Sequence, residues 1–395
     1  MQSKKGRKLL MIPGPIEFEP DVLAAMAEPT PSHVAPDFIE VFGHALDLLP
    51  AVFGAPDGQP LVVAGSGTLA MELAVANLIE PGDAVLVVNS GYFSDRMATI
   101  CARSGAQVTH VRAARVGDAP TLEAVAQALQ TSPFKLMTIT HVDTSTGVLL
   151  DVAGLTRLAQ SAGVLTVVDG VCSVAGEALR MTDWGVDVAL TASQKAIGVP
   201  PGLALLVARP RAIAAFHQRH APVASYYADW GNWLPIMEAY QARRAAYFGT
   251  PAVNLVLALD LALGHIVTEG HDPRVARHQR MSAAVKAGLH ALGLAQVPTA
   301  PELAAHTLTA AYYPEGVDGA AFLAATGAAG VMLAGGLHPE IRARYFRIGH
   351  MGVVNAGDVL ATVGAIEQGL QSAGYRFEPG SGLAAGQQAL LAAAS

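Results

Sequence analysis

The chain has 395 residues, of which 52% are hydrophobic and only 14% are charged, so it can fill the core of more than one domain. Its net charge of −7, without any long basic run, argues against nucleic acid or an anionic membrane as a partner. The two cysteines, Cys101 and Cys172, cannot build a disulfide framework, and no cluster of cysteine and histidine has metal-ligand spacing, so we expect no metal site.

The N-terminal segment is basic but does not have the features of a signal peptide. Residues 1–15, MQSKKGRKLLMIPGP, lack the apolar stretch and the small-residue cleavage site that such a peptide needs. No uninterrupted apolar run in the chain is long enough to span a bilayer. We therefore expect a cytoplasmic protein with no membrane partner.

From about residue 60, short apolar segments alternate with amphipathic ones. Helical patterns occupy 67–79 and 121–130 and also begin near Tyr92 and Asp151. The strand-like segments are 61–64, 84–88, 107–111, 136–142, 163–169, 186–192 and 203–208. This alternation predicts an α/β domain with a mostly parallel sheet and helices on both of its faces. In such sheets, ligands bind beyond the carboxyl ends of the strands.

The pattern changes beyond residue 251. Two long helical segments, roughly 252–268 and 272–293, precede shorter strands near 306–313, 330–334 and 344–349 and a last helix that runs to about residue 373. We therefore expect a large domain over residues 1–251, which includes the N-terminal segment, and a smaller α+β domain over 252–375. The tail, 376–395, is rich in Gly, Ala and Gln, which predicts a weak helix or a flexible segment.

Three polar features follow predicted strands. The sequence GSGT (65–68) opens a helix, and glycines at a helix N-terminus are typical of phosphate sites, although a plain strand-to-helix turn has the same pattern. Asp169 ends the strand GVLTVVD, where its carboxylate needs a cationic partner, unless it serves as a helix cap or a structural ion pair. Lys195, in TASQKAIG, lies between two apolar runs and either reaches water or has a chemical role.

Neighbouring parallel strands would bring Asp169 and Lys195 into one crevice with the phosphate site. This combination favours pyridoxal phosphate (PLP) as cofactor. The lysine would bind the aldehyde as a Schiff base, and the carboxylate would keep the ring nitrogen protonated. The helix N-terminus would bind the phosphate. A lysine in a desolvated site also loses its proton more readily.

The order of motifs along the chain makes this interpretation specific. The chain resembles the class V aminotransferases of PLP fold type I, and within them it is most similar to the alanine–glyoxylate and serine–pyruvate aminotransferases. The resemblance rests on MIPGPI (11–16), AGSGTL (64–69), THVDTSTGVL (140–149), VVDGVCS (167–173), LTASQKAIG (190–198), YFGTP (247–251) and RIGHMGV (347–353). Only the tail after Tyr375 departs from the family pattern.

The resemblance implies a role for each matching residue around the cofactor ring. Lys195 is the lysine that binds PLP and moves the proton, and Asp169 pairs with the ring nitrogen. Phe93 takes the place of the stacking aromatic residue, which is Trp in some relatives. Thr144 matches a hydroxyl residue near the ring oxygen. Arg347 matches the arginine that binds the substrate carboxylate, a task suited to a guanidinium fork.

The resemblance also implies a phosphate site shared between two subunits. Ser66, Gly67, Thr68 and Gln194 match phosphate ligands, and Thr68 replaces a histidine of some relatives. Tyr247 and Thr250 match residues that reach the phosphate from the other subunit, so a homodimer with shared active sites is expected. We expect His33 and His350 to be structural.

The expected function is amino-group transfer from a small L-amino acid, alanine or serine, to a 2-oxo acid, glyoxylate or pyruvate. No second arginine or lysine for a side-chain carboxylate is evident, which disfavours aspartate or glutamate. One alternative is a cysteine desulfurase, which needs a cysteine on a mobile loop of the C-terminal half, where this chain has none. A PLP-binding regulator is a non-enzymatic alternative, but no DNA-binding domain accompanies the fold.

Overall fold

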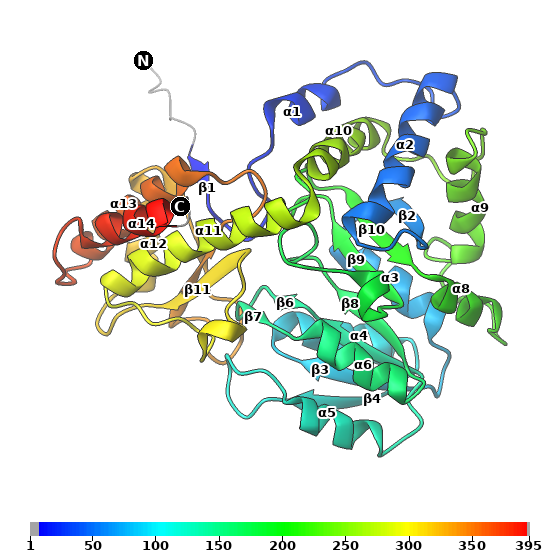
Figure 1. Ribbon diagram of the computed structural model, residues 1–395, viewed down its shortest axis with the longest axis horizontal. Helices are drawn as coiled ribbons and strands as arrows, with labels where there is room; N and C mark the ends of the chain where they lie inside the picture. The colour runs from blue at the N-terminus through cyan, green and yellow to red at the C-terminus, as the bar shows by residue number, and fades with distance from the viewer. Residues whose placement is uncertain (1–7, 393–395) are drawn as a thin grey trace.

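A seven-stranded sheet forms the centre of the larger part of the molecule (Figure 1). The computed structural model describes residues 8–392. The strands lie in the order β2-β10-β9-β8-β5-β3-β4, and β10 is antiparallel to both of its neighbours, whereas the other pairs are parallel. Their bounds are β2 Gln59–Ala64, β3 Ala84–Asn89, β4 Gln107–Arg112, β5 Leu136–Thr140, β8 Leu165–Asp169, β9 Val188–Ala192 and β10 Leu203–Ala208. The predicted α/β class with a mostly parallel sheet is confirmed.

Helices cover this sheet, so its central strands are apolar throughout. All six residues of β10 and all five of β8 are buried, as expected where both faces of a sheet are covered. Helix α3 packs on β9 and β10, α4 on β3 and β5, and α6 on β8. The helices of this part are α1 Pro20–Met26, α2 Pro36–Val52, α3 Gly67–Leu78, α4 Tyr92–Arg103, α5 Leu122–Leu129, α6 Val152–Ser161, α7 Met181–Trp184, α8 Pro210–His217, α9 Trp230–Gln241 and α10 Val253–Glu269.

A second, smaller layer of sheet and helices lies beside the first, at the left of Figure 1. Its three-stranded antiparallel sheet has the order β11-β14-β13 and packs against helices that share a separate hydrophobic core. The elements are α11 His271–Ala291, the 3-10 turn η1 Pro301–Leu303, β11 Leu308–Tyr312, α12 Gly319–Ala328, β12 Val331–Met332, β13 Ala334–Gly335, β14 Tyr345–Gly349 and α13 Ala356–Ser372. Two short strands of the large sheet's loops, β6 Val142–Asp143 and β7 Val148–Leu149, form a hairpin.

The two parts of the structure do not separate at residue 251 as the division into two domains expected from the sequence does. Helix α10 buries Val256, Leu259 and Leu263 in the hydrophobic core of the large sheet, and it packs against α1 and α2. The N-terminal strand β1 (Leu9–Leu10) instead pairs with β12, and Met11 joins the core of the smaller part. The chain therefore connects the two parts twice.

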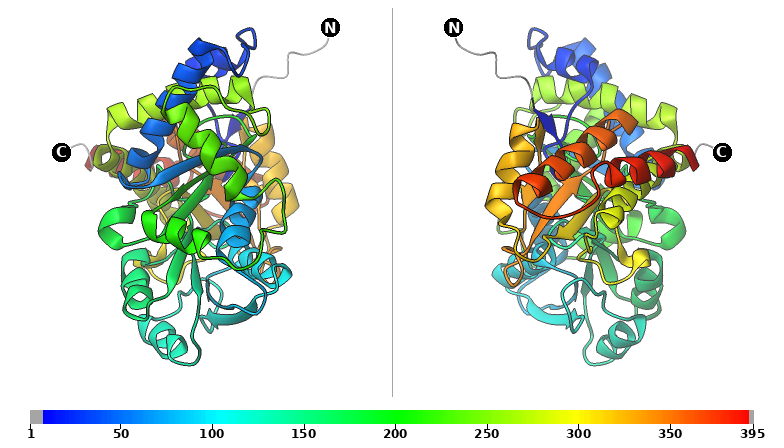
Figure 2. Two further views of the ribbon diagram at one scale, coloured as in Figure 1. Left: turned by 90° about the vertical axis from the view of Figure 1, so that its right-hand side faces the viewer. Right: turned by 90° about the vertical axis from the view of Figure 1, so that its left-hand side faces the viewer.

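The C-terminal segment contains a well-packed helix, α14 (Ser381–Ala392), against α11 and α13. Figure 2, right, shows α13 and α14 in orange and red across the outer face of the smaller part. The carboxylate of Glu367 on α13 accepts backbone N–H bonds from Gly380 at 2.9 Å, Gly382 at 3.0 Å and Leu383 at 3.2 Å. A side chain from another helix thus caps the start of α14.

Within residues 8–392, no single helix is both long and apolar enough to cross a membrane; the pair α10 and α11, bent by 89° at its junction, meets that test only when the two are taken together.

Candidate active site

Asp169 and Lys195 lie together at the carboxyl ends of two neighbouring parallel strands. Asp169 is the last residue of β8 and pairs in register with Leu190 of β9, and Lys195 follows the end of β9 by three residues. Both side chains are buried, and each shifts the pKa of the other. This edge of the sheet is the position at which ligands of open α/β folds bind.

Burial is the largest influence on the pKa of Asp169 and raises it to about 7. The backbone N–H of Val171 donates to Oδ1 at 3.0 Å, and the positive charges of Lys195 and Arg96 favour the ionised form. The negative charge of Asp143 acts in the opposite direction. No ion pair within residues 8–392 involves this carboxylate, and a protonated ring nitrogen would supply one.

Lys195 is a buried amine with a lowered pKa. Loss of hydration on burial is the main cause; the positive charge of Arg347 lowers the pKa as well, while Cys172 and Asp169 raise it. The ammonium donates a hydrogen bond to the carbonyl of Pro13. The next residue, Gly14, has φ of +94°, and a Cβ there would lie 2.6 Å from Lys195 Cδ. The N-terminal segment therefore closes over the lysine, and only glycine fits beside it.

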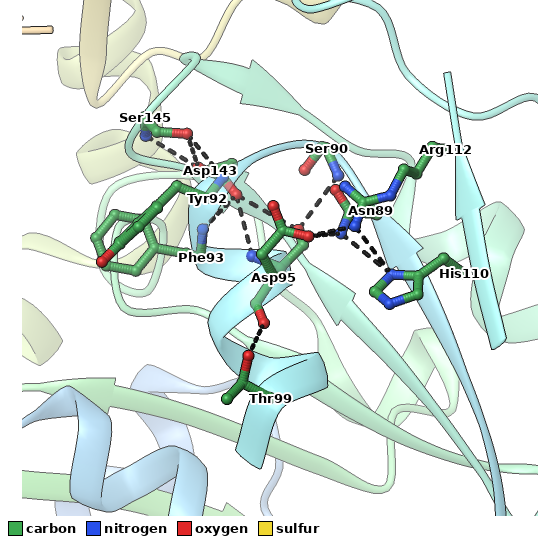
Figure 3. A network of polar contacts seen from close by, with 11 residues as sticks. Asn89, Ser90, Tyr92, Phe93, Asp95, Thr99, His110, Arg112, Asp143 and Ser145 are labelled. Carbon is green, nitrogen blue, oxygen red and sulfur yellow. Dashed lines mark hydrogen bonds and ion pairs between the residues drawn. The ribbon is translucent and has the colours of Figure 1, made fainter. Parts of the chain in front are cut away.

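Phe93 is held in place by a buried carboxylate that sequence reasoning did not identify. Asp143 accepts the backbone N–H bonds of Phe93 at 3.0 Å and Ser94 at 3.2 Å, at the N-terminus of α4 (Figure 3). Its other oxygen accepts bonds from the backbone N–H and the hydroxyl of Ser145, at 2.9 and 2.6 Å. Burial raises the pKa of Asp143. Asp143 thus joins the residue predicted to stack on the ring to the loop that carries Thr144.

A second set of polar contacts connects α4 to β3 and β4 (Figure 3). Asp95 on α4 forms an ion pair with Arg112 of β4 and accepts a hydrogen bond from Asn89 of β3 at 2.9 Å. The backbone carbonyl of Asp95 also accepts a bond from Thr99 at 2.9 Å. The contacts of the Asp95 carboxylate connect α4 to the sheet edge, so the start of α4 is held by this network as well as by Asp143.

Arg347 reaches the same place from the smaller part of the molecule. It lies on β14, where its Nε donates to the carbonyl of Gly335 at 2.9 Å and its Nη1 to the carbonyl of Thr144 at 3.1 Å. Thr144 itself is buried on the loop after β6. The structure therefore brings Arg347, Thr144 and Lys195 together from three distant segments.

The residues predicted to bind phosphate lie at the N-terminus of α3 and beside Lys195. Ser66 is the exposed N-cap residue of α3, followed by Gly67 and Thr68, and the Thr68 hydroxyl accepts a bond from Arg96 Nη1 at 3.0 Å. Among the described residues, the buried Oε1 of Gln194 has no hydrogen-bond partner. An unpaired buried polar atom needs a partner, and a ligand phosphate or its bound water would provide one.

Tyr247 and Thr250 are not brought to this group within one chain. Both lie in the segment between α9 and α10. Tyr247 is 66% exposed, and the centroid of its ring lies 5.4 Å from that of the His33 ring. No hydrogen bond, ion pair or ring contact within residues 8–392 connects either residue to Lys195 or Asp169. His350, by contrast, is buried and bonded to Thr309 at 2.8 Å.

Known proteins resemble this chain over most of its length. Residues 24–354 match the family model described as Aminotransferase class-V. Alanine–glyoxylate aminotransferase 1 of Saccharomyces cerevisiae is 41% identical over 356 residues, which cover 87% of this chain and 92% of that protein. The L-aspartate–glyoxylate aminotransferase of Paracoccus denitrificans is 31% identical, with 96% and 95% covered. The solved structure of an alanine–glyoxylate aminotransferase from Nostoc sp. superimposes with a TM-score of 0.87 at 32% identity, covering 94% of this chain and 97% of that one.

Proposed function

The chain belongs to the class V aminotransferases, and on this premise we propose that it is a PLP-dependent enzyme that moves an amino group from a small L-amino acid to glyoxylate or pyruvate. Alanine or serine is the proposed donor, and alanine with glyoxylate is the first pair to test. One observation carries this proposal. A carboxylate, an amine and a guanidinium, those of Asp169, Lys195 and Arg347, meet at the carboxyl edge of the sheet.

The residues of the site fit PLP in two respects. Among the described residues, Asp169 forms no ion pair, and PLP offers a protonated ring nitrogen. In the same part of the chain, Gln194 has a buried oxygen without a hydrogen-bond partner beside the proposed phosphate position. When bound, PLP supplies an electron sink for the bond that breaks at the substrate α-carbon.

Lys195 performs the proton transfer. Because burial lowers the pKa of its amine, a larger fraction is neutral at a given pH than for a lysine in water. The neutral Nζ would hold the cofactor covalently, and once the substrate amine has replaced it, the same nitrogen would move the proton from the substrate α-carbon to the cofactor. The segment at Pro13 and Gly14 covers the lysine and excludes water from this transfer.

Arg347 binds and orients the substrate. A guanidinium has five N–H donors, and the carbonyls of Gly335 and Thr144 use two of them, which fixes its plane. The donors that remain suit a carboxylate, bound through two oxygens. Alanine and glyoxylate present the same carboxylate, so the arginine serves both half-reactions.

The two cysteines do not support the desulfurase alternative. That reaction needs an accessible nucleophilic thiol, whereas Cys101 and Cys172 are both buried. Burial raises the pKa of Cys101 to about 12, and it raises that of Cys172 as well. Thiols in such surroundings are inert.

A homodimer with shared sites is part of the proposal. Tyr247 and Thr250 are exposed on one chain and are available to a second copy. The test mixes two inactive proteins, Lys195→Ala and the double variant Tyr247→Ala with Thr250→Ala, and measures activity after subunit exchange. Partial recovery is expected, because one of the two sites in the hybrid collects both defects and the other is intact. No recovery despite proven exchange would refute the sharing of sites.

Donor and acceptor profiling tests the activity itself. The purified protein is mixed with alanine, serine or aspartate, and the visible absorbance of bound PLP is followed before glyoxylate or pyruvate is added. Alanine or serine should bleach the absorbance, and glyoxylate or pyruvate should restore it. A preference for aspartate would move the donor to the class named for the Paracoccus relative, and the absence of any bleaching would refute transamination.

A further inference from the structure

The residues assigned to the cofactor phosphate have one property in common: none of them carries a charge. They are Ser66, Gly67, Thr68, Gln194, Tyr247 and Thr250. The N-terminus of α3 adds about half a unit of positive charge. A phosphate monoester carries about −1.5 to −2 at neutral pH. Neutral donors and a helix end therefore leave most of this charge uncompensated.

Arg96 forms a hydrogen bond with one of these residues, Thr68. It is on α4, one helical turn after Phe93, and its Nη1 donates to the Thr68 hydroxyl oxygen at 3.0 Å. Its guanidinium carbon lies over the rings of Phe93, at 4.7 Å, and Tyr92, at 5.3 Å. Two of these three contacts involve residues of the cofactor site, since Phe93 is the predicted stacking residue and Thr68 a predicted phosphate ligand.

The charge of Arg96 is not used by an ion pair within residues 8–392, whereas Arg112 on the neighbouring strand β4 is paired with Asp95. The positive charge of Arg96 also acts on Asp169, where it is one of the influences that lower the pKa of the carboxyl. Arg96 therefore lies close enough to act on both ends of the site, the phosphate end at Thr68 and the ring end at Asp169.

The hydrogen bond to Thr68 also determines what the hydroxyl can do. A threonine hydroxyl has one hydrogen to donate and lone pairs to accept with. Arg96 can only donate, so its bond occupies a lone pair of the oxygen. The hydroxyl hydrogen remains available for another acceptor, and a phosphate oxygen at the N-terminus of α3 is an acceptor only. Arg96 thus leaves the hydroxyl in the state that a phosphate ligand needs.

We propose that Arg96 is the cationic positioning residue of the cofactor phosphate: it sets the Thr68 hydroxyl as a donor to the phosphate and supplies the unit of positive charge that the other ligands lack. The inference rests on the proposed function, because it takes PLP as the ligand. It assigns Arg96 to the phosphate monoester and not to the substrate, whose carboxylate belongs to Arg347.

The test compares PLP with pyridoxal, which has the same ring and aldehyde but no phosphate. The cofactor-free full-length protein is titrated with each compound, and the dissociation constant is read from the absorbance of the bound ring. Arg96→Gln should weaken PLP by about 10- to 100-fold, the range for a lost charge-assisted contact. Its affinity for pyridoxal should fall by much less, because Arg96 acts on the ring end of the site only through its charge, which favours ionised Asp169. Arg96→Lys, which keeps the charge, should recover part of the loss.

Arg103→Gln is the matched control. Arg103 is exposed at the end of the same helix, so this change removes the same charge from α4 but no contact of the site. It should leave both dissociation constants unchanged. Thr68→Val removes the hydroxyl, and because Arg96 acts partly through it, the double variant of Thr68 and Arg96 should lose less affinity than the product of the two single losses.

The outcomes are distinguishable. A wild-type protein that binds neither PLP nor pyridoxal would contradict the proposed function itself. If wild type binds PLP but Arg96→Gln weakens PLP and pyridoxal equally, Arg96 only supports Phe93, and the phosphate assignment is wrong. Unchanged PLP affinity, or losses that multiply in the double variant, would also overturn it. If Arg96→Gln does not fold by circular dichroism, Arg96→Lys and Thr68→Val still decide, since both should affect PLP alone.

Discussion

Replacing Asp169 with asparagine should stabilise the cofactor-free protein and disable the enzyme. Burial raises the pKa of Asp169 from the ordinary 3.8 to about 7. Between these two values the folded chain holds the proton and the unfolded chain has lost it, so the contribution of Asp169 to the free energy of unfolding falls as pH rises through this window. At 1.36 kcal/mol per pKa unit, this shift corresponds to about 4 kcal/mol.

Asparagine keeps the shape of the side chain and does not ionise. The stability of Asp169→Asn relative to wild type should therefore increase from about pH 4 to about pH 7, by up to about 4 kcal/mol, and should stay constant at higher pH. The assay is urea unfolding of both cofactor-free proteins at a series of pH values. Catalysis should change in the opposite direction to stability. With PLP and substrate present, turnover of the variant should fall by about 100-fold or more, because asparagine cannot keep the ring nitrogen protonated.

A stability difference that does not change with pH would refute this reasoning, because it would mean that Asp169 is ionised in the folded protein as it is in the unfolded chain. Near-normal turnover would separately show that Asp169 is a structural residue only. The two measurements are independent, since the first is made without cofactor and the second requires it.

Three further changes test other parts of the molecule. Lys195→Ala should retain PLP without a covalent bond and lose transamination by about 1000-fold or more; borohydride reduction of wild type followed by peptide mapping should label Lys195, and a label elsewhere contradicts its role. Arg347→Lys should weaken single-turnover reaction with alanine and glyoxylate alike by about 10-fold or more, with ethylamine unaffected, so an effect on only one of the two acids would exclude a shared anchor. Glu367→Gln should reduce the free energy of unfolding by about 1–3 kcal/mol and increase hydrogen exchange in α14, with PLP affinity unchanged; unchanged exchange would show that α14 does not depend on this cap.

The sequence by itself determined the elements of the large sheet and the position of two reactive residues. Strands and helices are encoded by periodicities within a few residues, which is why the apolar run that ends at Asp169 corresponds to β8 (Leu165–Asp169). A parallel sheet places the carboxyl ends of its strands at one edge, so the sequence alone predicts that Asp169 and Lys195 lie in one crevice.

The tertiary structure decided the contacts that hold these residues in place. Asp143 meets Phe93 across 50 residues of chain, Arg96 meets Thr68 across 28, and Glu367 caps α14 across 13 or more. No local pattern marks such pairs, because each polar group finds its partner only after two separate elements have packed. The same holds for α10, because its apolar face does not by itself indicate which of the two cores it joins. In the structure it packs against α1 and α2 in the core of the large sheet. Local periodicity therefore specified the elements, whereas the burial of their faces selected the partners of each polar side chain.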